Sequence, residues 1–155
     1  MKQTIEVLEG VRKFLSEHVN DYIDNNNPFL DVKVPALKDK EIMVDYPDID
    51  SLPSSNTVYI IPDYMEVNPQ TTCSYLMNNS IKVFLFCKRD KHDNLIRRAS
   101  TYANAIMQVF IRYTNLGGAV NLCEIQSADF YPSVTADNSI AAYEITVALR
   151  YVLQV

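Results

Sequence analysis

The sequence predicts an α+β fold: a mostly antiparallel sheet with two amphipathic helices packed on one face, plus a projecting β-hairpin. Three observations lead to this expectation. The last sixteen residues alternate between apolar and polar side chains, and two earlier segments repeat apolar residues at steps of three and four. The elements also follow in the order helix, weak strand, two strands, helix, two strands, which favours an antiparallel sheet.

The composition is that of one globular domain. At 155 residues, with 48% apolar and 21% charged side chains, the chain can bury a substantial core, so we expect a single domain over residues 1–155. Ten Tyr and six Phe occur without any Trp. Tyr suits half-buried strands and interfaces, where the ring packs and the hydroxyl stays in water.

Charge and cysteine usage narrow the function classes. A net charge of −5 disfavours a protein that grips phosphate backbones, although nucleic acid could still slide past it. Three cysteines without a C-x-x-C spacing predict free thiols in a reducing compartment. The N-terminus does not resemble a signal peptide, and no apolar run approaches about eighteen residues, so we expect a cytosolic protein without a membrane span.

The first helix is expected over Thr4–Asn20. Gly10 lies inside it and costs about 1 kcal/mol relative to Ala, which predicts close packing against a neighbouring element. The polar run 24–28 closes with a proline and ends the helix. The apolar stripe consists of Ile5, Leu8, Val11, Leu15, Val19 and Tyr22.

The segment Phe29–Asn56 is the least regular part of the chain. Val32 and Val34 alternate with polar residues and predict a short strand, and Ile42–Val44 predicts another. Several prolines follow, and prolines at this density suit edge strands and irregular surface.

A buried strand is expected over Thr57–Ile61, ending near Pro62, because its residues are β-branched and aromatic. Asn68-Pro69-Gln70 predicts a turn. The following segment, Thr71–Lys88, predicts one long or interrupted strand with a bulge or bend at Asn78-Asn79-Ser80. Its second half, from residue 81 to 87, is apolar on both faces and is expected to be the central strand.

The second helix is expected from about Asp93, capped by Asp93 or Asn94, to Tyr113. A pair of glycines at 117–118 then marks the end of this helix. A strand over Val120–Ala128 and a loop over 133–138 follow. The terminal strand, Ile140–Val155, would span roughly 50 Å if unbroken, so another element must cover its outer edge.

Few residues point to chemistry, and we predict no catalytic, cofactor-binding or metal-binding residue. Asp45, Asp48 and Asp50 could gather a hard cation, but the Gly and distal Glu of a calcium loop are missing, which favours a solvated turn. His18 and His92 have no Cys, Ser or carboxylate at a motif spacing and are expected to be structural or solvated.

One positive patch is visible in the sequence. It could meet a phosphate or an acidic partner, but interrupting acidic residues favour a solvated corner between a strand and a helix. The patch consists of Lys88, Arg89, Lys91, Arg97 and Arg98.

An aromatic and methionine-rich segment brackets the predicted turn. Tyr64 and Met65 precede Asn68 and Gln70, and Tyr75 and Met77 follow them. Such residue types are favoured in protein contacts. The hairpin either projects as a contact surface or folds back on the core, and the sequence leaves both readings open.

The layout resembles that of the tail terminator and tail-completion proteins, or head–tail joining proteins, of long-tailed bacteriophages and prophages. Two sequence segments are typical of these proteins: residues 81–90, which lead into a helix, and residues 142–147 near the end of the chain. The matching pieces are Thr4–Asn20, Thr57–Lys88, Asp93–Tyr113, Val120–Ala128 and Ile140–Val155.

The resemblance implies a structural role and no enzymatic activity. It implies a homo-oligomer, a hexameric ring at the head-proximal end of the tail tube, which stops tube growth and contacts the head connector while DNA passes through its lumen. The protein would be located in the neck of the virion after assembly in the bacterial cytoplasm. We hypothesise that the loop Asp45–Asp50 and the hairpin around Asn68–Gln70 lie at intersubunit or tail-facing surfaces.

Two alternatives remain at this point. One is another virion assembly role, such as a head-closure protein or a tail tube subunit. The other is a small α+β enzyme that uses His92 with Asp90 or Asp93, although no substrate is suggested.

Overall fold

The computed structural model describes residues 4–26, 33–90 and 94–154. Within these residues, two α-helices and a five-stranded sheet confirm the predicted α+β class. The elements are α1 (Thr4–Asn26), β1 (Ile42–Met43), β2 (Asn56–Thr71), β3 (Ser74–Lys88), α2 (Leu95–Arg112), β4 (Leu122–Tyr131) and β5 (Ile140–Gln154).

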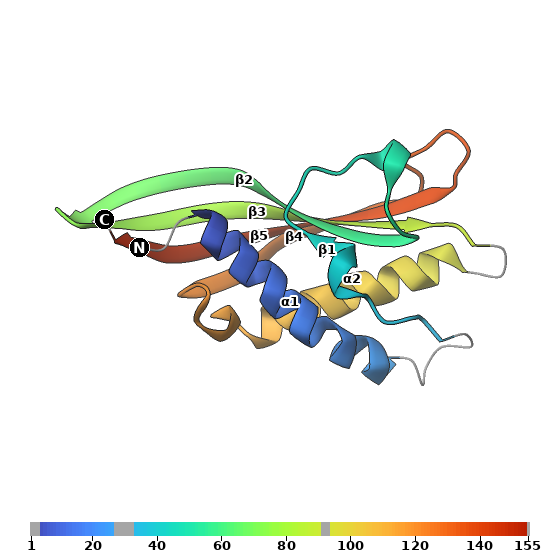
Figure 1. The fold of residues 1–155 in the computed structure, drawn as a ribbon, viewed down its shortest axis with the longest axis horizontal. Helices are drawn as coiled ribbons and strands as arrows, with labels where there is room; N and C mark the ends of the chain where they lie inside the picture. Colours follow the sequence, from blue (N-terminus) through green and yellow to red (C-terminus); the bar gives the residue numbers. More distant parts are fainter. Residues whose placement is uncertain (1–3, 27–32, 91–93, 155) are drawn as a thin grey trace.

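The sheet has the strand order β1-β2-β3-β5-β4 (Figure 1). β1 runs parallel to β2, and the other neighbouring pairs are antiparallel. The prediction of a central strand over residues 81–87 is confirmed, since β3 lies between β2 and β5. The long terminal strand is confirmed as well, and β4 covers the outer edge of β5.

The predicted bulge at Asn78-Asn79-Ser80 is wrong, because β3 and β5 pair without interruption from Ser74 to Lys88. Both asparagines have cross-strand partners: Arg150 donates to the Asn78 side chain, and Asn79 donates to the Tyr151 hydroxyl. These hydrogen bonds keep polar residues in the ladder. The register shift lies on β2 instead, between Pro62 and Tyr64.

The predicted end of a strand near Pro62 is also wrong, because β2 continues through Pro62 and Pro69 to Thr71. β1 pairs only with Val58 and Tyr59, so the distal part of β2 has no outer partner in the described chain. A proline lacks the N–H needed for a ladder bond and is tolerated on an edge strand when that position faces solvent.

α1 is longer than predicted and ends at Asn26, because Ile23 extends the buried stripe by another turn. The predicted strand at Val34 is irregular chain, and Val32 lies outside the described residues. Asn20 holds this segment by donating to the Leu37 carbonyl and accepting from the Leu37 N–H, each at 2.8 Å.

α2 begins at Leu95, where the Asn94 side chain accepts a hydrogen bond from the Arg97 N–H at 3.1 Å. Asn94 is therefore the cap, while the alternative cap, Asp93, lies outside the described residues. The close packing predicted for Gly10 is confirmed, since a Cβ there would lie 3.2 Å from the Ala119 Cβ.

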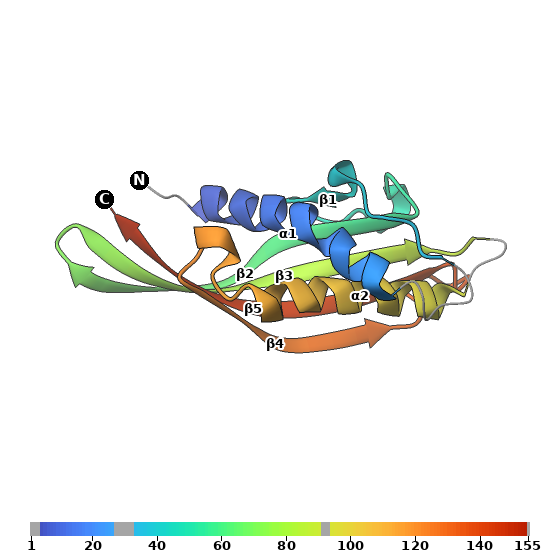
Figure 2. The same ribbon diagram turned by 90° about the horizontal axis from the view of Figure 1, so that it is seen from below.

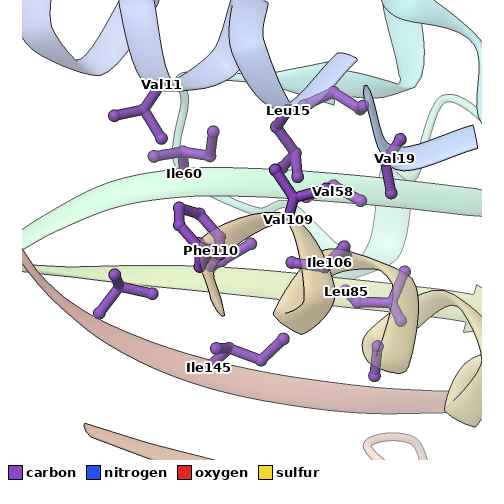
Figure 3. Packing of buried hydrophobic residues seen from close by; sticks show 14 of the residues in the cluster. Val11, Leu15, Val19, Val58, Ile60, Leu85, Ile106, Val109, Phe110 and Ile145 are labelled. Carbon is purple, nitrogen blue, oxygen red and sulfur yellow. The ribbon is translucent and has the colours of Figure 1, made fainter. Parts of the chain in front are cut away.

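Both helices lie on one face of the sheet, as predicted (Figure 2). α1 contacts β1 and β2, α2 contacts β3, β4 and β5, and the helices also contact each other. The main core fills the space between the helices and the sheet (Figure 3). Its central members are Val11, Leu15, Val19, Val58, Ile60, Leu85, Ile106, Val109, Phe110 and Ile145.

A smaller cluster covers part of the opposite face of the sheet. Tyr59, Phe86 and Ile140 pack there against Leu52, with Val134 at the margin. The segments that supply this cover, residues 43–55 and 132–139, lie near the start of β2 (Figure 1). The remaining half of this face, which we call the open face, carries no such cover among the described residues.

Candidate functional site

The most prominent surface feature is the distal part of the β2–β3 hairpin. This hairpin arm comprises residues 62–81. Met77 and Ile81 in its β3 strand belong to the core, while its tip projects beyond both helices together with the end of β5 (Figures 1 and 2). The predicted turn at Asn68-Pro69-Gln70 is wrong, because these residues belong to β2. The chain reverses at Thr72 and Cys73, where the Thr71 and Ser74 hydroxyls form a 2.7 Å hydrogen bond.

The turn lies later than predicted because the strand pairing decides its position. Leu76 pairs with Asn68 on one side and with Val152 on the other, which places Asn68 inside the sheet. Asn-Pro favours a turn locally, but this preference is weak compared with a continuous ladder on a three-stranded arm.

The predicted contact residues on β2 are exposed. The exposed fractions are 61% for Tyr64, 45% for Met65 and 50% for Val67, and Gln70 is exposed as well. Asn68 is half-buried. Strand alternation places Tyr64 on the open face and Met65 on the face shared with the helices, beyond the end of α1. Large apolar side chains exposed together indicate a contact surface.

The predicted contact residues on β3 are placed differently. Met77 is only 1% exposed and belongs to the core, and Tyr75 is half-buried against that core. β5 covers β3 by pairing Tyr151 with Met77 and Leu153 with Tyr75. The expectation of a Met77 contact surface is therefore wrong, because Met77 packs in the middle of the arm.

The acidic loop is a hydrogen-bonded turn at the other end of β2. Asp48 caps a short 3-10 helix by accepting from the Asp50 N–H at 3.2 Å and the Ser51 hydroxyl at 3.0 Å. Asp45 accepts from the Tyr46 N–H at 2.7 Å. All three aspartates are exposed, and no group of three His, Cys, Asp or Glu among the described residues could hold a metal ion.

The acidic loop and the hairpin arm do not meet. Burial raises the pKa of Tyr59, and the nearby charges of Asp45 and Asp48 raise it further, which locates the loop beside the proximal half of β2. The arm begins beyond this half, at Pro62. The structure therefore places the two predicted interface regions on opposite halves of the sheet.

The residues of the predicted positive patch do not form one surface, because one of them is buried. Arg98 is 6% exposed and donates to the Asn56 side chain at 2.8 Å and to the Lys88 carbonyl. Arg89 and Arg97 remain at the surface, while Lys91 lies outside the described residues. Arg98 thus joins α2 to the ends of β2 and β3 and is structural.

His18 packs between aromatic rings. Its ring centroid lies 4.2 Å from that of Phe14 and 4.9 Å from that of Tyr113. This position agrees with the structural role expected for His18. His92 and Asp93, which belong to the alternative enzyme hypothesis, lie outside the described residues.

The open face holds a shallow trough that the sequence did not reveal. It has a volume of about 540 Å³ and is lined by Asp63, Glu66, Glu124, Arg150 and uncharged side chains such as Thr146. These residues come from β2, β3, β4 and β5, and only strand pairing brings them together. Alternation within each strand was the available signal, but it does not tell which strands are neighbours.

An ion pair borders this trough. Lys82 donates to Glu144, and this hydrogen bond raises the pKa of Lys82. Tyr131 donates to the other Glu144 oxygen at 3.2 Å, which raises the pKa of Tyr131. The pair adds fixed polar groups to the open face, and such an arrangement is suited to binding by charge and hydrogen bonds.

No protein-family model matches the chain, and no curated protein is significantly similar to it. In the described part of the chain, no helix is both long enough and apolar enough to cross a membrane. The function must therefore be argued from the surfaces that the fold exposes.

Proposed function

We propose that this chain is a structural subunit of a phage or prophage particle, which forms a closed ring with copies of itself at the head-proximal end of the tail tube. The observation that carries the proposal is the asymmetry of the subunit. The hairpin arm exposes Tyr64, Met65 and Val67 at one edge of the sheet, while β4 is an unpaired edge strand on the other side.

When two different surfaces lie on opposite sides of a subunit, they favour a contact that repeats from one copy to the next. Such a heterologous contact closes into a ring when its rotation divides a full turn, and otherwise it grows into a filament. A hexamer is the ring size that the resemblance to tail terminators implies. The order of a long helix, a long hairpin, a second helix and two closing strands supports the same assignment.

The proposed ring ends growth of the tail tube and presents its other side to the head connector. Its lumen lets DNA pass without specific binding, and a net charge of −5 supports this role because an acidic wall repels phosphate. The protein then acts in the neck of the virion, after assembly in the cytoplasm of the bacterial host.

The separation of the two predicted interface regions supports different neighbours for them. In this proposal the hairpin arm contacts the next copy, while the acidic loop with Asp45 and Asp50 faces the tail tube. Both aspartates are exposed and lie in a hydrogen-bonded loop, where a partner can reach them.

Light scattering coupled to size-exclusion chromatography, followed by negative-stain electron microscopy, tests the proposal. We expect a particle of six times the 17.7 kDa chain mass, with a central hole. A filament would point to a tube subunit, and a twelvefold ring to a head-closure protein. A chain that stays monomeric at high concentration would overturn the ring.

A further inference from the structure

Charge is segregated between two parts of this chain. Residues 56–81 contain Asp63 and Glu66 but no Lys or Arg, while residues 94–123 contain Arg97, Arg98 and Arg112 but no Asp or Glu. The first stretch is β2 with the hairpin arm, and the second contains all of α2. α1, by contrast, carries both signs along its length.

The exposed face of α2 combines positive charge with apolar side chains. Arg97 and Arg112 lie at its two ends on the solvent side, while Arg98 points into the structure. Ile96 and Ile111 are 56% and 60% exposed beside these two arginines. The face therefore has an isoleucine and an arginine at each end, the exposed Asn104 and Gln108 between them, and no acidic residue.

The outer strand of the hairpin arm has the complementary character. Asp63 and Glu66 are exposed on the side of the open-face trough, and the exposed Tyr64, Met65 and Val67 lie beside them on the same strand. Surfaces of opposite charge attract each other and also exclude partners of the wrong sign.

The two surfaces also match in length. α2 has 18 residues, which corresponds to roughly 27 Å of helix. The edge of β2 from Asp63 to Thr71 is extended over about 26 Å. The arm can therefore lie along the whole helix. Its two carboxylates are only roughly 10 Å apart, while the two arginines are separated by roughly 22 Å along the helix, so Asp63 and Glu66 together face the arginine at one end.

One copy cannot make this contact with itself. The tip of the hairpin arm projects past the ends of both helices (Figure 1), and the exposed face of α2 is turned away from the sheet that carries the arm. We infer that the hairpin arm of one copy docks on the exposed face of α2 of the next copy. This inference rests on the proposed ring, and it assigns the surface that receives the arm to α2 instead of the edge strand β4.

Charge reversal on each surface tests the contact. The arm variant carries Asp63→Lys and Glu66→Lys, and the helix variant carries Arg97→Glu and Arg112→Glu. Each variant alone brings like charges together, so we expect each to run as a single 17.7 kDa chain in light scattering. Circular dichroism and thermal melting confirm that each variant is folded.

Mixing the two variants gives the sharper result. The lysine-bearing arm of one variant meets the glutamate-bearing helix of the other, and the wild-type charges meet in the reverse pairing. We expect the equimolar mixture to recover the mass of the wild-type assembly. The matched control, Asp21→Lys with Asp24→Lys, reverses two exposed acidic residues of α1 and should assemble like wild type.

The outcomes separate this inference from the proposed function. A wild-type ring that persists in both variants overturns the arm-to-helix contact and leaves the ring standing. A filament that is lost in each variant and restored by mixing supports the contact and overturns the ring. A monomeric wild-type chain overturns both.

Discussion

Lys82 of β3 and Glu144 of β5 form an ion pair on the open face of the sheet, and Tyr131 of β4 donates to the second oxygen of the same carboxylate. The three side chains join three neighbouring strands. Both charged side chains are mostly buried, with exposed fractions of 29% and 14%. A partly buried, hydrogen-bonded pair of this kind stabilises more than a fully exposed pair.

Replacing Glu144 with Gln removes the charge and keeps the shape. We expect the free energy of unfolding to fall by about 1 kcal/mol, as measured by urea denaturation at neutral pH. The pKa of Lys82 is raised above its ordinary 10.5, so the stabilisation is complete below that pH and is lost as pH rises through the raised value. A difference between the two proteins that stays constant while the lysines titrate at alkaline pH would contradict this assignment.

Replacing Asn20 with Asp tests the two hydrogen bonds that hold the backbone of Leu37 against α1. The amide both donates to and accepts from the backbone of Leu37, whereas a carboxylate can only accept. The Leu37 carbonyl then faces an oxygen, and we expect a loss of about 2 kcal/mol in unfolding free energy. Asn20→Ser, which keeps a donor, should cost less in the same measurement.

Gly117 has a φ of +65°, and a Cβ on it would lie 2.8 Å from the Phe14 ring. Gly117→Ala therefore combines backbone strain with a clash, and we expect it to cost at least about 2 kcal/mol in chemical denaturation. Gly118, at φ +92°, is the matched control because its added Cβ meets nothing within 4 Å. Equal effects of the two alanines would show that Phe14 moves freely.

In the proposed ring, substitutions on the exposed side of the arm should affect assembly without affecting folding. Met65→Ser with Val67→Ser changes exposed positions, so we expect the melting temperature to stay close to wild type while assembly is lost in light scattering. Met77→Ala removes a buried side chain, and it should lower the unfolding free energy by about 2–5 kcal/mol. Loss of assembly from Met77→Ala alone would indicate that the arm acts through its internal packing.

The three cysteines should differ in reactivity. Cys73 is exposed at the tip of the arm, whereas Cys87 and Cys123 are buried. Burial, with a smaller contribution from the charge of Glu124, raises the pKa of Cys123 to about 11. Because the thiolate is the reactive form, we expect iodoacetamide at pH 8 to modify Cys73 alone, as read by mass spectrometry. Labelling of all three in urea provides the control.

Long periodic segments made most of the fold predictable from the sequence. The terminal strand and the stripe of α2 each repeat over many residues, and their bounds agree closely with β5 and α2. The central strand followed from residues that are apolar on both faces. The extension of β2 through Pro62 and Pro69 could not be foreseen in this way. Whether a strand tolerates a proline depends on its position in the sheet, and the sequence does not show which strands are at the edge.

The contact residues were predictable only in part. Tyr64 and Met77 look alike in the sequence, since each lies in an alternating segment near the same predicted turn. The structure exposes Tyr64 because β2 is an edge strand, and it buries Met77 because β5 and the helix layer surround it. Pairing between distant strands decides this difference, and local pattern carries no information about it.

The two prolines of β2 affect how the free edge of this strand can pair with other chains. A long bare strand would recruit further strands without limit, and the product would be an aggregate of cross-β type. Pro62 and Pro69 interrupt the row of N–H groups that such recruitment needs. The prolines therefore limit backbone pairing at this edge, so that any contact made by the arm depends mainly on its side chains.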